Sequence, residues 1–221
     1  MDTKPGAIER LTGKLNTTLS ICCEDDVAEA IINRVAEQLG IAQYIETKLF
    51  GAWKNCFTLV AALAIEDKCN ENSLFVLDGD VAECKTPGQW KTTLENGLLT
   101  GTSKIASERR KSALKTITQF SPPAGASLER TLYDMLRSGV KAKDKVEQQL
   151  IDAFIKLEAV TNSHDWVLEP LRQLGIKREI GLARVVAIAS RSKGWGNYVK
   201  SVRGWLRKKL PTLVENQNAG M

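Results

Sequence analysis

Residues 73–86 read SLFVLDGDVAECKT and carry the strongest β-strand signal in the chain. Two short apolar runs in this stretch flank the turn-forming residues Asp78, Gly79 and Asp80. Asp-Gly between two apolar runs is typical of a β-hairpin. The sequence therefore predicts one short hairpin near 72–86, as the only sheet in the protein.

Asp78 and Asp80 are also candidate metal ligands by residue type. Two turn carboxylates without further ligands nearby in the sequence more often serve the turn itself than a bound cation. Ser163, His164 and Asp165 are consecutive, so their side chains point in different directions and cannot form a catalytic triad. We assign no catalytic residue, no metal and no cofactor, and the sequence predicts a protein that is not an enzyme.

On both sides of the predicted hairpin, the sequence predicts helices. Glu24, Asp25 and Asp26 suit a helix N-terminus, apolar residues recur every four positions over 27–39, and Gly40 ends the pattern. Similar stripes follow after 53, 107, 127, 144 and 165 and over 180–210. We expect a mainly α protein, a two-lobed helical bundle with one short β-hairpin.

The sequence SPPAG at 121–125 is the clearest break, because two prolines and a glycine cannot continue a helix. It divides an N-terminal lobe, 1–120, from a C-terminal lobe, 126–211. Pro211 is expected to end the last helix, and residues 212–221 read as a tail.

Charge is distributed unevenly along the chain, whose net charge is +5. Residues 21–100 hold six basic against thirteen acidic side chains, whereas 161–221 hold eleven against four. A basic end can meet a polyanion, or it can meet the acidic end of another copy. The pattern predicts nucleic-acid binding together with self-association into a homo-oligomer, as in a nucleocapsid or coat-like protein.

The segment SRSKGWGNYVKSVRGWLRKKLP at 190–211 is the predicted binding surface. Its apolar stripe is that of a packed helix, but 191–209 also hold seven positive charges, no acid and several aromatic residues. Cations attract phosphates and aromatic planes stack on bases, so RNA or single-stranded nucleic acid is the expected ligand. The predicted contact residues are Arg109, Arg110, Lys111, Lys115, Arg191, Lys193, Trp195, Tyr198, Lys200, Arg203, Arg207, Lys208 and Lys209.

Two alternative functions fit the same pattern. The basic face of a helical adaptor could bind an acidic protein partner. The related segments EQLGIAQYI at 37–45 and RQLGIKREI at 172–180 also outline a helix-turn-helix DNA reader. A basic helix with tryptophans can bind membranes, but the apolar stripe is narrow, and we expect no membrane association.

The five cysteines point to a reducing compartment. Their number is odd, none forms a CxxC pair, and His164 is the only histidine, so a zinc site is not expected. The first residues lack the apolar segment of a secretory signal. These features predict reduced thiols and a cytoplasmic location.

Overall fold

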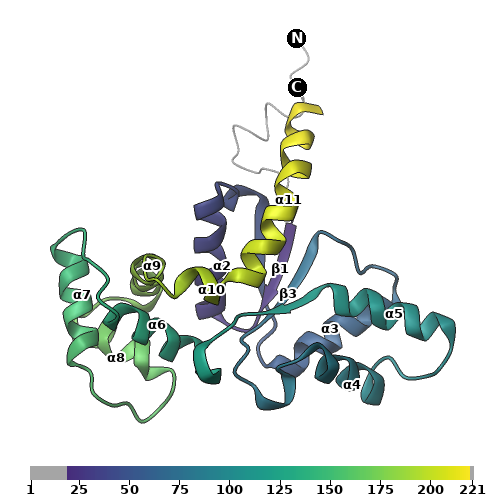
Figure 1. The fold of residues 1–221 in the computed structure, drawn as a ribbon, viewed down its shortest axis with the longest axis horizontal. Coiled ribbons are helices and arrows are strands. Elements are labelled where there is room, and N and C mark those ends of the chain that lie inside the picture. Colours follow the sequence, from purple (N-terminus) through teal and green to yellow (C-terminus); the bar gives the residue numbers. More distant parts are fainter. Residues whose placement is uncertain (1–18, 220–221) are drawn as a thin grey trace.

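A four-stranded parallel sheet lies at the centre of the computed structural model, which describes residues 19–219 (Figure 1). The strand order is β2-β1-β3-β4, and each neighbouring pair is parallel. The strands are β1 (Leu19–Cys23), β2 (Ile45–Leu49), β3 (Ser73–Leu77) and β4 (Ile117–Gln119). The prediction of a helical bundle with a lone hairpin was wrong, since the fold is a helix-rich α/β architecture.

Strand β3 explains the error at 72–86. Its residues alternate between two cores: Leu74 and Val76 pack on one face of the sheet, and Phe75 and Leu77 on the other. A strand buried on both faces reads as an unbroken apolar run, as parallel strands do. The second apolar run is a short 3-10 helix, η2 (Ala82–Cys84), so no hairpin partner follows the Asp-Gly turn.

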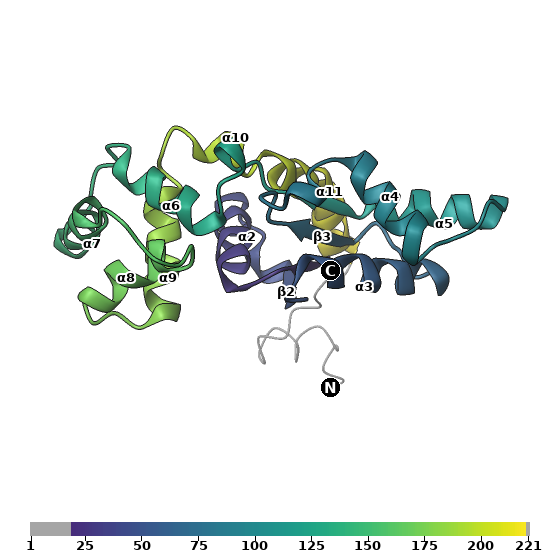
Figure 2. The same ribbon diagram turned by 90° about the horizontal axis from the view of Figure 1, so that it is seen from below.

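The helices cover both faces of the sheet. Helices α2 and α11 pack on one face, while α3 and α5 pack on the other, where α4 contacts both of them. Figure 2 shows α3, α4 and α5 at one end of an elongated molecule and α6 to α9 at the other. The bounds are α2 (Asp26–Leu39), α3 (Trp53–Ile65), α4 (Pro87–Gly97), α5 (Lys104–Lys115), α6 (Leu128–Arg137), α7 (Lys145–Lys156), α8 (Asp165–Gln173), α9 (Arg178–Ala189), α10 (Trp195–Tyr198) and α11 (Lys200–Ala219).

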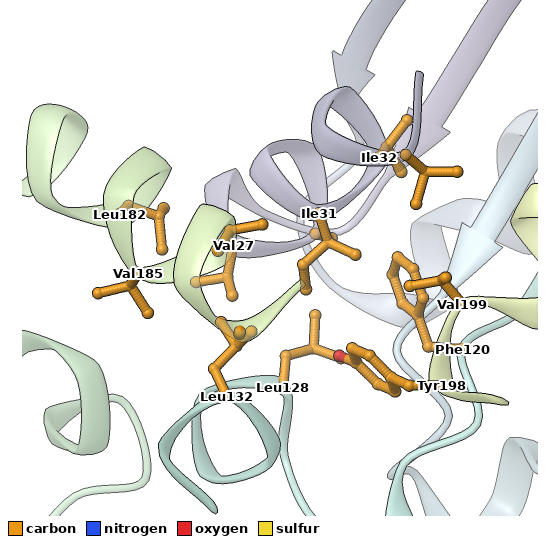
Figure 3. Packing of buried hydrophobic residues seen from close by; sticks show 14 of the residues in the cluster. Val27, Ile31, Ile32, Phe120, Leu128, Leu132, Leu182, Val185, Tyr198 and Val199 are labelled. Carbon is orange, nitrogen blue, oxygen red and sulfur yellow. The ribbon is translucent and has the colours of Figure 1, made fainter. Parts of the chain in front are cut away.

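Helix α2 joins the sheet to the lobe of helices α6 to α9. One side of α2 packs on the sheet, and its other side contacts α6 and α9. In Figure 3, Val27 and Ile31 of α2 lie beside Leu132 of α6 and Leu182 and Val185 of α9. One continuous apolar core therefore runs from the sheet through α2 into the lobe.

The chain enters the lobe of helices α6 to α9 after residues 121–125 and returns to the sheet through α10 and α11. Helix α10 brings Tyr198 back onto Phe120, with ring centroids 5.4 Å apart, and the Ser121 amide donates to the Tyr198 carbonyl at 3.1 Å. Helix α11 then packs on β4 and α2. It continues to Ala219, past Pro211, where the sequence predicted its end and a tail.

The similarity of segments 37–45 and 172–180 reflects the same way of ending a helix. Helices α2 and α8 both end in a left-handed glycine, Gly40 and Gly175. The following isoleucine amides, of Ile41 and Ile176, donate back to carbonyls five residues earlier, as in a Schellman motif. The first copy leads into strand β2 and not into a second helix, so the helix-turn-helix outline is absent at 37–45.

The turn after β3 requires glycine. Gly79 has φ +85°, and a Cβ at this position would lie 2.5 Å from the carbonyl oxygen of Phe120. We expect Gly79→Ala to lower the free energy of unfolding by about 2 kcal/mol, from the left-handed conformation and the clash together.

Urea unfolding measures this change. The matched control is Gly97→Ala in α4, where a Cβ meets nothing within 4 Å and φ is not in the left-handed region. The control should be neutral or gain about 0.5 kcal/mol, since alanine suits a helix better. Equal stability of the two variants would contradict the tight approach at Gly79.

Candidate functional site

Carboxylates collect at the carboxyl ends of the central strands. Glu24 and Asp25 follow β1, and Asp78 and Asp80 follow β3. The connections leave these two neighbouring strands toward opposite faces of the sheet, to α2 and α4. This is the topological switch point, where open α/β sheets bind their ligands. We call this cluster the carboxyl edge: it consists of Glu24, Asp25, Asp78, Asp80 and the nearby Glu129 of α6.

The β1 side of the carboxyl edge is fixed by helix α2. Asp25 caps this helix, and its Oδ1 accepts from the Ala28 amide at 2.9 Å. Asp26, one residue on, binds Arg178 of α9 through two hydrogen bonds of 2.5 and 2.6 Å. The guanidinium lowers the pKa of Asp26. Asp26 therefore faces the helical lobe as a paired carboxylate, apart from the unpaired carboxylates beside it.

Asp78 carries the least compensated carboxylate of the edge. Its Oδ1 is buried and has no hydrogen-bond partner among the described residues. Burial and the neighbouring Glu24, Asp25 and Asp80 raise its pKa to about 9. At neutral pH without a bound cation, Asp78 therefore holds a proton.

The other edge carboxylates show the same crowding. Burial, followed by the charges of Asp80 and Asp25, raises the pKa of Glu24 to about 7. The pKa values of Asp25 and Asp80 are also raised, and burial is the largest cause for both. Like charges gathered away from water are costly, so the edge favours either bound protons or a bound cation.

A tyrosine hydroxyl also lies beside this edge without a partner. Tyr198 is only 1% exposed, and its hydroxyl makes no hydrogen bond with the described residues. After burial, the charge of Asp78 is the largest cause that raises the pKa of Tyr198 well above its usual range. Unpaired buried polar atoms are rare in proteins, and here two of them lie in the same region.

Glu129 connects the edge to a histidine. The side chain of Glu129 is 5% exposed, and one of its oxygens lies 2.5 Å from His164 Nδ1 at the start of α8. The imidazole itself is 58% exposed, so its other nitrogen can meet a ligand from solvent. The hydrogen bond with Glu129 raises the pKa of His164, which increases its protonated fraction near neutrality.

The edge is not a ready-made metal cage. Within residues 19–219, no three His, Cys, Asp or Glu side chains already converge as a metal site would require. Carboxylate oxygens are nevertheless the ligands that Mg²⁺ and Ca²⁺ prefer. Binding a cation here requires rotation of the Asp78, Asp80 and Glu24 side chains toward a common point.

Several of the predicted nucleic-acid contacts serve the fold. Trp195 and Tyr198 are 2% and 1% exposed, so neither ring can stack on a base in this arrangement. Arg191 pairs with Glu147 of α7 at 2.6 Å. Others bind within the protein: Arg203 to Gln38, Arg109 to the Ile65 carbonyl, and Arg110 to the Leu99 and Gly101 carbonyls.

The remaining predicted contacts lie on the surface. Exposed side chains are those of Lys111, Lys115, Lys193, Lys200, Arg207 and Lys208, and Lys209 is half-buried. The structure gathers three of these, Lys115, Lys208 and Lys209, around one cavity. The predicted basic surface therefore consists of separate exposed charges and one cavity lined by three lysines.

A scan of protein-family models and searches of curated proteins and solved structures gave no match to this chain. The five cysteines are free thiols. Among the described residues, no helix is long and apolar enough to cross a membrane.

The sequence did contain a signal for the carboxyl edge. The runs SICCEDD and SLFVLDGD both place acids directly after an apolar, strand-forming run, with a helix pattern between them. In a βαβ unit the two strand ends meet at one edge of the sheet. The hairpin prediction for 72–86 did not place the acids after the two strands at the same edge.

Asp78→Asn tests the crowding of charge. The folded protein keeps the Asp78 proton up to about pH 9, whereas the unfolded chain releases it near pH 4. Raising the pH between these values therefore destabilises the wild-type fold. An asparagine cannot ionise, so in EDTA at pH 8 the variant should be more stable by roughly 1 kcal/mol or more.

Urea unfolding at pH 8 and pH 5 checks this expectation. The gain should shrink toward pH 5, and the exposed Glu158→Gln should show no comparable gain. A variant that is less stable than wild type at both pH values would show that the Asp78 carboxylate is compensated after all.

Proposed function

We propose that this protein is a divalent-cation-dependent enzyme that acts on phosphate esters, with nucleic acid as its substrate. The observation that carries the proposal is the carboxyl edge, where acids from the ends of β1 and β3 meet at the switch point of a parallel sheet. Ligands of open α/β folds bind at this place.

A bound cation accounts for the features that the fold leaves uncompensated. It would neutralise the charges that raise the pKa values of Glu24 and Asp78, and it would give the buried Asp78 Oδ1 a partner. Asp78, Asp80 and Glu24 are the residues best placed to hold it. A structural ion pair would instead need a basic side chain. Arg178 is already engaged by Asp26. The charges of Lys85 and His164 lower the pKa of Asp80 without reversing its rise.

The residues around the edge supply the rest of the chemistry. A divalent cation polarises a phosphoryl oxygen and activates a water molecule. His164, protonated and held by Glu129, is placed to give a proton to the oxygen that leaves phosphorus. The Asp26–Arg178 pair fixes α9 beside the edge.

Nucleic acid is the phosphate ester that the charge pattern favours. Residues 161–221 hold eleven basic against four acidic side chains, and six of the predicted contacts are exposed. Binding of RNA or single-stranded nucleic acid stays a prediction from the sequence. The carboxyl edge suggests in addition that the bound nucleic acid is cleaved.

The second candidate is the function predicted from the sequence alone, a non-enzymatic, self-associating nucleic-acid-binding protein. The observation in its favour is the cavity lined by Lys115, Lys208 and Lys209, which needs no cation to attract phosphates. Self-association and an acidic protein partner remain predictions of the same charge pattern.

Metal binding is the direct test of the carboxyl edge. Titration of Mn²⁺ or Mg²⁺ into wild-type protein, followed by calorimetry, should show binding that strengthens from pH 6 to pH 8, because protons held at Asp78 and Glu24 must leave. The double variant Asp78→Asn, Asp80→Asn should lose binding at least tenfold. Glu158→Gln should bind as wild type does, and equal binding by all three proteins would remove the edge from the site.

Turnover tests the reaction. Labelled single-stranded RNA and DNA incubated with Mg²⁺ or Mn²⁺ should be cleaved by wild type and not in EDTA. His164→Gln should lower kcat about 100-fold, as expected for loss of a proton donor, with little change in cation affinity. Glu129→Gln should move the alkaline limit of the pH profile to lower pH, because the carboxylate raises the pKa of His164.

Wild-type protein that binds the cation but cleaves neither substrate would contradict nucleic-acid cleavage and leave the cation site standing. Unchanged kcat in His164→Gln would remove the histidine from the reaction.

A further inference from the structure

A second candidate site lies at the opposite end of the sheet. A cavity of about 460 Å³ opens at the amino ends of β3 and β4, next to Ser73 and Thr116. Lys115, Trp205, Lys208 and Lys209 line it. Its volume is in the range of small-molecule and cofactor sites.

Strand β4 brings these side chains together. Lys115 is the last residue of α5, two positions before β4 begins. Helix α11, which carries Trp205, Lys208 and Lys209, packs on the same strand. Residues more than eighty positions apart in the sequence therefore face one cavity.

The positive charge of this cavity is largely uncompensated. Lys115 and Lys208 are exposed, and neither forms an ion pair within the described part of the chain. Lys209 is held more firmly: its side chain is 12% exposed, and its ammonium group lies 5.7 Å from the centre of the Trp205 ring. Glu71, its partner at 3.1 Å, is 88% exposed and can be displaced by an incoming anion.

Neutral polar groups complete the site. Asn70, Ser73 and Ser112 also line the cavity of about 460 Å³. An adjoining cavity of about 210 Å³ shares Cys69 and Ser112 with it, but Asp67 and Glu108 line that second cavity beside Arg109 and disfavour an anion there. We therefore call only the cavity of about 460 Å³ the lysine groove.

We propose that the lysine groove binds the phosphate backbone of single-stranded nucleic acid, with Trp205 as the surface for one base. Lys115 and Lys208, which make no competing ion pair, attract phosphates of any sequence, and the part of the Trp205 ring that is not packed against the core can stack on any base. An acidic protein would use the charges but has no comparable use for the tryptophan face.

The groove is distinct from the carboxyl edge. The two sites lie at opposite ends of β3, about 15 Å apart for a five-residue strand. Binding at the groove does not depend on the proposed reaction, and it can be measured in EDTA.

Fluorescence anisotropy of a labelled single-stranded 30-mer, as RNA and as DNA, tests the proposal across a salt series in EDTA. Wild type should show a log-log salt slope of about −2, from three lysines at about 0.7 each. Lys115→Gln with Lys208→Gln should weaken binding at least tenfold at low salt and make the slope shallower by about 1.4. Glu71→Gln should tighten binding about threefold, since a competing carboxylate is removed.

The matched control is Lys156→Gln, an exposed lysine at the end of α7 that lies outside the groove and is not among the predicted contacts. It should change affinity less than twofold. Equal losses in Lys156→Gln and in the double variant would overturn the groove in favour of diffuse surface charge.

Two further measurements identify the ligand class and the stacking residue. Wild-type tryptophan emission should be quenched by the 30-mer, and Trp205→Phe should lose most of that quenching. Polyglutamate of similar charge should bind at least tenfold more weakly than RNA or DNA. Equal binding of polyglutamate would overturn nucleic acid and assign the groove to an acidic protein. Metal binding at the carboxyl edge is scored separately, so failure of either site leaves the other testable.

Discussion

The wide apolar face of helix α2 packs against two parts of the structure, and this shared packing determines where the rest of the molecule can lie. Val27, Ala28, Ile31, Ile32, Val35 and Ala36 are each no more than 1% exposed. The sheet and α11 cover one part of this face, while α6 and α9 cover the other. Asp25 caps the same helix, so its packing also fixes the carboxylates that follow β1 against those that follow β3. The packing of α2 therefore sets both the position of the lobe and the geometry of the carboxyl edge.

The carboxyl edge is a place where the fold gives up stability. Carboxylates that keep their protons to about pH 7 and pH 9 lie together, although a sequence with fewer acids there would fold more easily. Unfavourable local arrangements of this kind persist at functional sites, where a ligand relieves them. Arg178 and His164 each engage one neighbouring acid, Asp26 and Glu129, and leave the central ones uncompensated.

The helices were readable from the sequence because their signals are local. Asp25 with Gly40, Ser127 and Asp144 each mark a helix end through a cap that the structure contains. The sheet was not readable in the same way, because β2 is polar on its exposed side and β4 has only three residues. Parallel pairing joins residues such as Ser20 and Ser73 that no local pattern relates. The carboxyl edge and the lysine groove arise from that pairing, so neither was visible as a site, although the individual residues Lys115, Lys208 and Lys209 were named.

The return of α11 to the sheet has a consequence for how the chain folds as it is made. One face of the sheet is completed only when residues after Lys200 reach β4 and α2. Until then, Leu74 and Val76 of β3 and the neighbouring Phe120 lack their last cover on that face, and a parallel sheet assembled from distant segments forms slowly. A nascent or truncated chain that ends before α11 therefore leaves part of this core exposed, which promotes aggregation.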